Sequence, residues 1–239
     1  MDEEQKNIII SADDFGISRL ASENILKLVE QGKIDRVEVM MSKNITSALA
    51  ERLLASKVKI DIHLHLAKNE LDFWQEHKRR IEDGAILRGI KFLAKYILGV
   101  TSTKNIKKEW EGQIEEFIRV FKKAPDGASS HEHIHFFPPY FSCILDLCRK
   151  FEVGYIRFGR KSSINYSAIS KILNWLRKRN LNKFNKSKID SADFMISFDW
   201  TNDLQLISSQ YDKTASKEIV FHPEKVNEFN VLGGFNKFN

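Results

Sequence analysis

The chain has 239 residues, of which 42% are hydrophobic and 29% charged, a composition typical of a soluble globular protein. No run of 18 apolar residues occurs, which argues against a transmembrane helix, and the acidic N-terminus does not resemble a secretory signal. Cys143 and Cys148 are the only cysteines, and they fall within one predicted helix, so no disulfide framework is expected. These features predict a protein of the reducing cytoplasm, with a homo-oligomer left open.

The net charge of +6 is unevenly distributed along the chain. Residues 153–189 contain ten lysines and arginines and no acidic residue, so the remaining residues carry a net negative charge. Because the basic charge is local and no recognised nucleic-acid motif accompanies it, we do not expect a nucleic-acid-binding module. The apolar spacing of residues 169–176 predicts a core-packed helix with a solvated basic face. The alternative is that residues 160–189 contact an anionic membrane or a phosphorylated or lipid-linked sugar.

Short apolar runs alternate with amphipathic patterns through most of the chain. The runs predict strands, and the 3.6-residue patterns between them predict helices, whereas residues 67–104 have no clear pattern. Repeated strand–helix alternation predicts an α/β protein with a mostly parallel sheet, either a barrel or an open doubly wound sheet. The predicted strands are 7–11, 36–41, 58–66, 128–135, 155–158 and 218–222, and the predicted helices are 18–32, 46–55, 105–123 and 138–150.

Six of the seven histidines gather at three places in this pattern. Alternate residues of a strand share a face, so the histidines of two neighbouring strands would point into one space. Imidazole is the commonest metal ligand at neutral pH, although each histidine taken alone is more often a hydrogen-bonded core residue. The six are His63 and His65 in the third strand, His131, His133 and His135 in the fourth, and His222 at the end of the last; His77 stands apart.

Two adjacent carboxylates, Asp13 and Asp14, directly follow the first strand. The carboxyl ends of parallel strands are where α/β proteins bind ligands, so one carboxylate could bind a metal while the other accepts a proton. The alternative is a simple turn in which an aspartate caps the next helix. Together with two histidines, one aspartate would form a 2-His-1-carboxylate site suited to metal-assisted hydrolysis.

These motifs, in this order, resemble those of the YdjC/ChbG-like carbohydrate deacetylases. The resemblance spans residues 7 to about 224 and implies one domain over 1–239, with excursions at about 67–104 and 160–215. It implies a deformed TIM-like (β/α) barrel that uses a divalent metal, most often Mg²⁺, with Zn²⁺ as an alternative, to remove acetyl groups from N-acetylated amino sugars or oligosaccharides. The matching segments are SADDFG at 11–16, DIHLHL at 61–66, SSHEHIHFFP at 129–138, YIRFG at 155–159 and EIVFHPE at 218–224.

The resemblance also implies a role for individual residues. Three of them would bind the metal, two would act as general base and general acid, and four more would position the base or contact the sugar. The metal ligands would be Asp14, His63 and His131; the base Asp13 and the acid His222; and the positioning or substrate-binding residues Arg157, His65, His133 and His135.

The chain departs from the family pattern at two positions near these residues. Ser129 stands where the family usually has an aspartate, so we expect a carboxylate that orients a metal ligand to be missing. His65 replaces a usual Asn or Thr, which would add a ligand or alter substrate contacts. The chain also ends soon after the last motif, so we expect the barrel to be open or completed differently. The alternatives are another metal-dependent amidase or phosphoesterase on the same scaffold, or a non-catalytic carbohydrate-binding relative.

Overall fold

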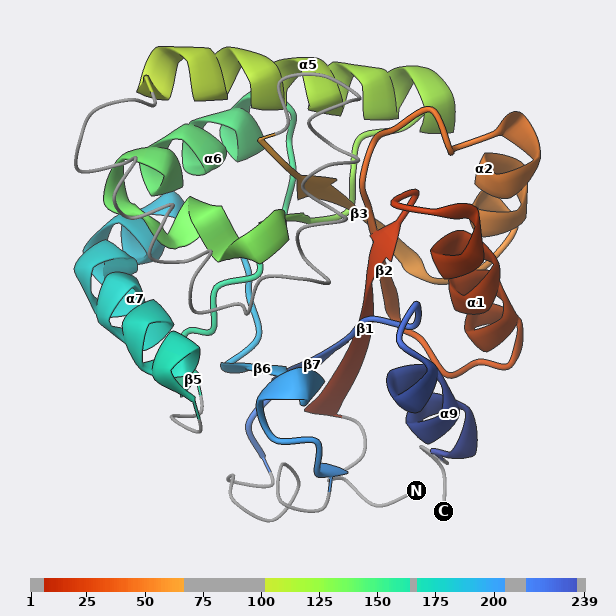
Figure 1. The fold of residues 1–239 in the computed structure, drawn as a ribbon. Helices are drawn as coiled ribbons and strands as arrows, with labels where there is room; N and C mark the ends of the chain where they lie inside the picture. The colour runs from red at the N-terminus through yellow and green to blue at the C-terminus, as the bar shows by residue number, and fades with distance from the viewer. Residues whose placement is uncertain (1–6, 67–101, 164–166, 205–213, 236–239) are drawn as a thin grey trace.

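The structure is a computed structural model that describes residues 7–66, 102–163, 167–204 and 214–235 (Figure 1). Strands and helices alternate through these residues, as the sequence predicts. The strands are β1 (Ile8–Phe15), β2 (Arg36–Val39), β3 (Lys59–Leu64), β4 (Ala128–Ser130), β5 (Ser162–Ser163), β6 (Phe194–Ser197) and β7 (Lys217–Phe221). The helices are α1 (Arg19–Glu30), α2 (Ser47–Leu54), α5 (Thr103–Phe121), α6 (Pro138–Lys150), α7 (Ala168–Ser187) and α9 (Val226–Gly234), with short 3₁₀ turns η2 (His131–Phe136) and η3 (Phe198–Trp200).

The strands form one sheet in the order β4-β3-β2-β1-β7-β6-β5, and every pair is parallel. Residues predicted as a strand at 155–158 instead bridge two parts of this sheet. The Ala128 N–H donates to the Tyr155 carbonyl, and the Ile156 N–H donates to the Asp190 carbonyl, at 3.0 and 2.9 Å. The sheet therefore curls into a deformed TIM-like barrel, as expected.

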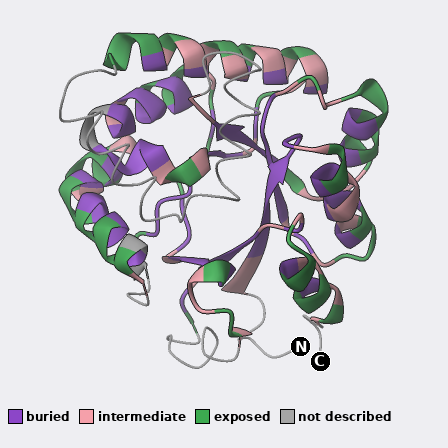
Figure 2. Ribbon diagram, in the orientation of Figure 1, coloured by how far each residue is buried: buried purple, intermediate pink, exposed green. Residues whose placement is uncertain are grey.

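Helices cover the outside of the curled sheet, and their inner faces are buried (Figures 1 and 2). In α5 the apolar stripe read from the sequence is the buried face, which confirms that prediction. Its members are Ile106, Trp110, Ile114, Phe117 and Phe121. At the start of α1, the Ser18 hydroxyl accepts the Ala21 N–H at 3.0 Å and fixes where the helix begins, just after the Asp13-Asp14 pair.

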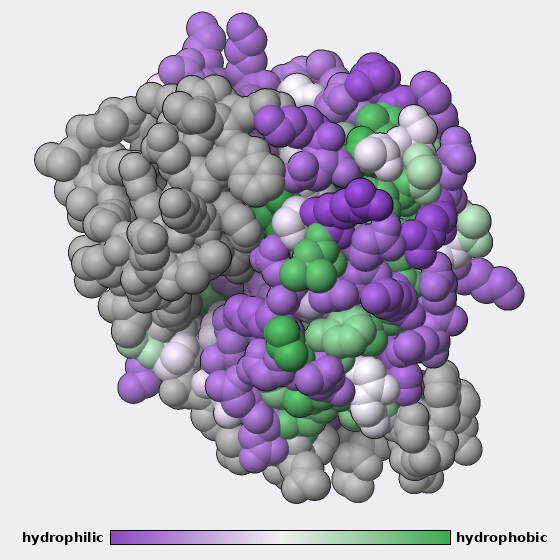
Figure 3. Space-filling model, turned by 45° about the vertical axis from the view of Figure 1, so that its right-hand side comes forward, coloured by the Kyte–Doolittle hydropathy of each residue, from purple (hydrophilic) through white to green (hydrophobic). Residues whose placement is uncertain are grey.

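The basic segment forms α7 and packs as an ordinary amphipathic helix. Leu173 and Leu176 are buried as predicted, whereas Ile172, which the same spacing assigned to the core, is exposed together with Lys171, Lys178 and Arg179. On the opposite side of the molecule from α7, the described part of the face in Figure 3 is predominantly hydrophilic, with apolar side chains in small separate groups. No described helix is long and apolar enough to cross a membrane. Contact of α7 with an anionic membrane or a lipid-linked sugar stays a prediction.

The strand predicted at 128–135 is wrong beyond Ser130. The chain turns into η2, where Glu132 and His133 adopt the left-handed conformation with φ of 55° and 54°. The Ser130 hydroxyl accepts the His135 N–H at 3.0 Å, so a side chain replaces the hydrogen bonds that a longer strand would make. The histidines of this run therefore do not share one face.

Other predictions met different outcomes. The sequence reading missed β6 and α9, both of which the structure contains. The predicted excursion at 67–104 lies outside the described residues except for 102–104, which form the start of α5 and the residue before it. His77 also lies outside the described residues. The division into a single domain stays a prediction.

Candidate metal centre and active site

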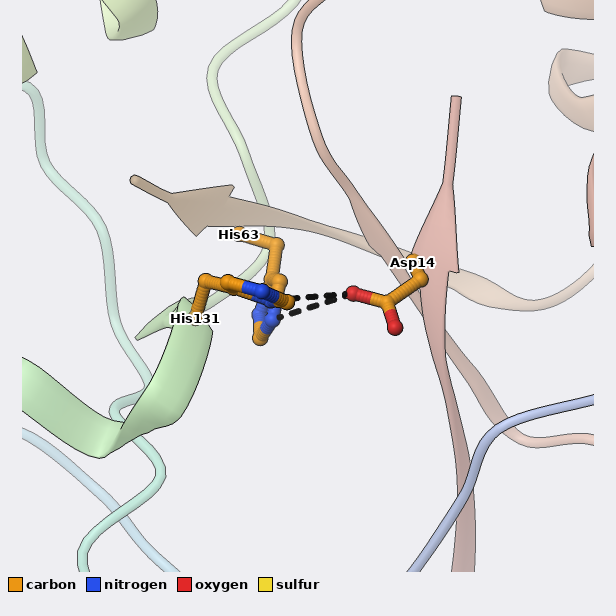
Figure 4. Close-up of side chains that lie close together, drawn as sticks. All are labelled: Asp14, His63 and His131. Carbon is orange, nitrogen blue, oxygen red and sulfur yellow. Dashed lines mark ion pairs between the residues drawn. The ribbon is translucent and has the colours of Figure 1, made fainter. Parts of the chain in front are cut away.

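Three predicted ligands converge at the carboxyl ends of β1, β3 and β4 (Figure 4). Asp14 lies near the end of β1, His63 near the end of β3, and His131 directly after β4. Asp14 Oδ1 lies 3.1 Å from His131 Nδ1 and 3.7 Å from His63 Nε2. Ligand atoms that share one ion at about 2.1 Å lie roughly 3 to 4 Å from each other. One carboxylate and two imidazoles at this spacing fit a divalent metal ion.

The backbone around Asp14 is shaped by a tight turn. Asp14 itself has a φ of 71°, an uncommon left-handed conformation for a residue other than glycine. Gly16 follows with a φ of 96°, and a Cβ there would lie 2.4 Å from the Met40 carbonyl oxygen. The chain turns sharply away from the sheet here, just after the strand residues that carry the Asp13 and Asp14 carboxylates.

Asp13 is held beside the ligand group by Arg157. Two guanidinium nitrogens donate to the two Asp13 oxygens at 2.8 Å each, which is the strong bidentate geometry. Asp13 Oδ2 lies 3.7 Å from His63 Nε2. Burial alone would lower the pKa of Arg157, but its carboxylate neighbours raise that pKa well above the usual value, so the guanidinium stays charged.

The interior of the barrel around this group is rich in charge. Arg157 also donates to Glu218 at 2.8 Å, and Arg36 forms a bidentate pair with Asp61 at 2.6 and 2.7 Å. Burial raises the pKa of Asp61 well above its usual range, which weakens its negative charge. Around the ligand group, the carboxylates outnumber the guanidiniums of Arg36 and Arg157, and a bound cation would reduce this local excess. The carboxylates are Asp13, Asp14, Glu38, Asp61 and Glu218, and all five are buried.

The carboxylate expected to be missing beside His63 is supplied from another strand. Ser129 Oγ lies 2.6 Å from His63 Nδ1 and donates to Glu38 Oε2 at 2.6 Å. Glu38 belongs to β2, and sequence reasoning did not single it out. The available signal was a charged side chain inside a short apolar strand, two residues after Arg36.

Two of the other histidines are held by the surrounding backbone. His65 Nε2 lies 3.3 Å from the Met41 carbonyl oxygen, and burial lowers the pKa of His65 to about 4. His135 is fully buried, with Nδ1 2.6 Å from Ser130 Oγ and Nε2 2.9 Å from the Arg157 carbonyl oxygen. Neither belongs to the ligand group, and His135 presents no surface to a substrate.

His133 has aromatic neighbours instead. Its ring packs edge-on against Trp200 and Phe136, with centroids 6.0 and 6.1 Å apart. Desolvation, together with the nearby Arg157 charge, lowers the pKa of His133 well below its usual value. The ring is therefore neutral at pH 7.

His222 directly follows β7, at the same end of the barrel as the other strand-end residues. Its N–H donates to Glu228 Oε2 at 2.7 Å, and its Nδ1 lies 3.4 Å from that oxygen. Asp199, His222 and Glu228 form a second group, separate from the three predicted ligands, and Lys225 Nζ lies within 3.1 Å of the Asp199 and Glu228 carboxylates. Asp199 and Glu228 were missed because Asp199 precedes His222 by 23 positions and α9 was not predicted.

Comparison with known proteins agrees with this architecture. The chitooligosaccharide deacetylase of Salmonella paratyphi B is 24% identical over 222 residues, which cover 92% of this chain and 82% of that protein. The carbohydrate deacetylase of Oceanobacillus iheyensis is 27% identical over 150 residues, covering 60% and 61%, and the human carbohydrate deacetylase is 23% identical over 162 residues, covering 66% and 50%. The match thus spans only about half to three fifths of the length of the latter two.

A solved structure and a family model complete the comparison. A crystal structure from Enterococcus faecalis, of a candidate cellobiose-phosphate cleavage protein, superimposes with a TM-score of 0.60 over 94% of this chain and 89% of that one. Its 16% identity shows a shared fold. The model of the family described as YdjC-like protein matches residues 7–231, nearly the whole chain. This chain therefore belongs to the YdjC-like family.

Proposed function

We propose that this protein removes acetyl groups from N-acetylated amino sugars or their oligosaccharides by metal-dependent hydrolysis. The observation that carries the proposal is the convergence of Asp14, His63 and His131 beside a second carboxylate, Asp13, at the ligand-binding end of a parallel barrel. The names of the relatives support the choice of an acetylated sugar as substrate.

In this proposal Asp14, His63 and His131 hold a divalent metal ion. When bound, the ion would polarise the acetyl carbonyl and lower the pKa of a water molecule. The donor set does not decide which ion binds. Two imidazoles favour Zn²⁺ or another transition metal, whereas Mg²⁺ prefers oxygen ligands, and the family resemblance implies Mg²⁺.

Asp13 is the proposed general base. The Arg157 guanidinium donates to both of its oxygens, which fixes the orientation of the carboxylate and so the direction from which a proton is accepted. His222 is the proposed general acid and would donate its proton to the leaving amine nitrogen. The Glu228 carboxylate lies 3.4 Å from His222 Nδ1 and orients the imidazole.

The sugar would lie against the side chains that surround the ligand group. His133 and Trp200, whose rings contact each other, are proposed to pack against the substrate. His65 and His135 are proposed to act on the substrate only indirectly, because His65 Nε2 and both ring nitrogens of His135 already lie against backbone or serine oxygens. Arg157 is proposed to position the base, since it is fully buried.

The test is acetate release from N-acetylglucosamine oligomers. Metal-stripped protein would be assayed alone and with added Mg²⁺, Zn²⁺ or Co²⁺, and Asp14→Ala serves as the control. We expect metal-dependent release with a bell-shaped pH profile, because the base must be ionised while the acid is protonated. We expect the control to lose at least about 100-fold in rate, since it lacks one of three ligands. No release by metal-loaded wild-type protein, or equal release by Asp14→Ala, would contradict the proposal.

A further inference from the structure

We propose that Glu38 is a positioning residue: through the Ser129 hydroxyl it sets the proton on His63, so that the Nε2 atom of His63 is left free to bind metal. The inference rests on the proposed function, because it assumes that His63 is a metal ligand. It assigns to Glu38, a residue of β2, the orientation of a metal ligand, which the aspartate replaced by Ser129 would otherwise provide.

The direction of each hydrogen bond follows from the chemistry of the three groups. The Glu38 carboxylate, when ionised, only accepts, so the single proton of the Ser129 hydroxyl goes to Glu38 Oε2 at 2.6 Å. The Ser129 oxygen must then accept from His63 Nδ1, 2.6 Å away. The proton of neutral His63 therefore lies on Nδ1.

This tautomer is the one that a metal ligand needs at this position. Nε2 carries the lone pair, and Nε2 is the atom that lies 3.7 Å from Asp14 Oδ1 and 3.7 Å from Asp13 Oδ2. A partner on the second ring nitrogen also fixes the orientation of the ring and raises its basicity. Glu38, Ser129 and His63 are each at most 2% exposed, so bulk water does not reach this series of hydrogen bonds to replace a lost partner.

The other oxygen of Glu38 is linked to the proposed base, Asp13, through Arg157. Glu38 Oε1 accepts from Arg157 Nη2 at 3.0 Å, and the same nitrogen donates to Asp13 Oδ1 at 2.8 Å. Burial by itself would raise the pKa of Glu38, but the Arg157 charge and the nearby His63 hold that pKa below its usual value. One carboxylate thus connects the ligand side and the base side of the site.

A simpler role for Glu38 would be to neutralise Arg157 inside the barrel. Glu218 offers a matched control, because it is also buried and accepts from Arg157 at 2.8 Å, while its other described hydrogen bonds run to Ser11 and Tyr155 rather than to His63 or Ser129. If neutralisation were all that mattered, Glu38→Gln and Glu218→Gln would affect metal binding alike.

The experiment measures Zn²⁺ and Mg²⁺ affinity of the metal-stripped full chain by calorimetry, with circular dichroism to confirm folding. We expect Glu38→Gln and Ser129→Ala each to weaken metal binding by about 10- to 100-fold, and Glu218→Gln to change it by less than about threefold. The double variant Glu38→Gln/Ser129→Ala should lose little more than either single variant, because both break the same chain of hydrogen bonds.

A relocated carboxylate provides a rescue that packing alone would not give. In Glu38→Ala/Ser129→Asp the carboxylate stands directly beside His63 Nδ1, and we expect affinity within about fivefold of wild type and well above that of Glu38→Ala. Nitrogen NMR shifts of His63 in metal-stripped wild type should show the proton on Nδ1.

The outcomes separate this inference from the proposed function. Unchanged metal affinity in Ser129→Ala and Glu38→Gln, in a wild-type protein that binds metal, would overturn the role of Glu38 alone. A wild-type protein that binds no divalent metal would overturn the proposed metal centre itself.

Discussion

Arg157 is the cation around which the interior of the barrel is organised. It is fully buried and donates to Asp13, Glu38 and Glu218. Buried ion pairs add little net stability when intact, because desolvation offsets the attraction. Removing one partner is different, because the remaining charges stay buried without compensation.

We therefore expect Arg157→Met to lower the free energy of unfolding by about 3–5 kcal/mol, since three carboxylates lose their cation. Urea denaturation at pH 7 measures this. The matched control is Arg52→Met, whose pairs with Glu23 and Glu30 are solvent-exposed and should be worth at most about 1 kcal/mol. Equal, small losses in both variants would contradict the organising role of Arg157.

His135 makes stability depend on pH. Burial lowers its pKa to about 3 in the folded protein, against about 6.5 in an unfolded chain. Only the unfolded state then binds a proton between these values, so the stabilisation is complete above pH 6.5 and is lost as pH falls toward 3.

We expect His135→Asn, which cannot titrate, to show a shallower pH dependence than wild type. The difference in slope should be about 1.4 kcal/mol per pH unit between roughly pH 6 and pH 4. Urea denaturation at several pH values across this range gives both slopes. Parallel curves for the two proteins would show that His135 is not buried and neutral.

At the scale of elements, the backbone just before β4 passes very close to the buried Arg36 and Asp61 side chains of β2 and β3. Gly127 immediately precedes β4, and a Cβ there would lie 2.6 Å from Arg36 Nη2 and 2.9 Å from Asp61 Cγ. An added methyl group would therefore have to displace the buried Arg36–Asp61 pair, whose hydrogen bonds are 2.6 and 2.7 Å long.

Gly127→Ala should accordingly destabilise the protein by about 1–3 kcal/mol through overpacking. Gly112→Ala is the control, because Gly112 lies at an exposed position of α5 with open space around it. There alanine should stabilise the helix by roughly 0.5–1 kcal/mol. Thermal or urea unfolding distinguishes the two, and changes of the same sign would refute the close approach at β4.

At the scale of the whole molecule, metal binding is coupled to folding because only the folded chain brings the proposed ligands together. The ligands come from strands far apart in the sequence, so an unfolded chain cannot present them together. An ion that binds only the folded state stabilises it by mass action.

We expect a divalent metal at 100 times its dissociation constant to stabilise the stripped protein by about 2.7 kcal/mol. Calorimetric melting with and without metal measures the effect. Asp14→Ala should abolish the shift, whereas Asp199→Ala, at the separate group that Lys225 already neutralises, should retain it. A shift that persists in Asp14→Ala would locate the binding elsewhere.

Local patterns in the sequence were sufficient for much of the fold. The stripe of α5 was read correctly because a helix buries one face and its apolar residues recur every 3.6 positions. Asp13 and Asp14 were placed at a strand end because an apolar run stops just before them. The parallel sheet followed from the alternation of strands and helices, which requires crossover connections.

The sequence by itself thus determined most of the elements, a mostly parallel α/β sheet and the set of ligand candidates, whereas the barrel and the roles of single residues were what the family resemblance implied. Only the tertiary structure decided that the chain turns after Ser130, since side-chain hydrogen bonds there replace a strand whose period-two pattern looked complete. Only the tertiary structure brought Glu38 to His63 and Glu228 to His222. The physical reason is that periodicity records which face of an element is buried, whereas contacts between distant elements depend on how the sheet curls and closes.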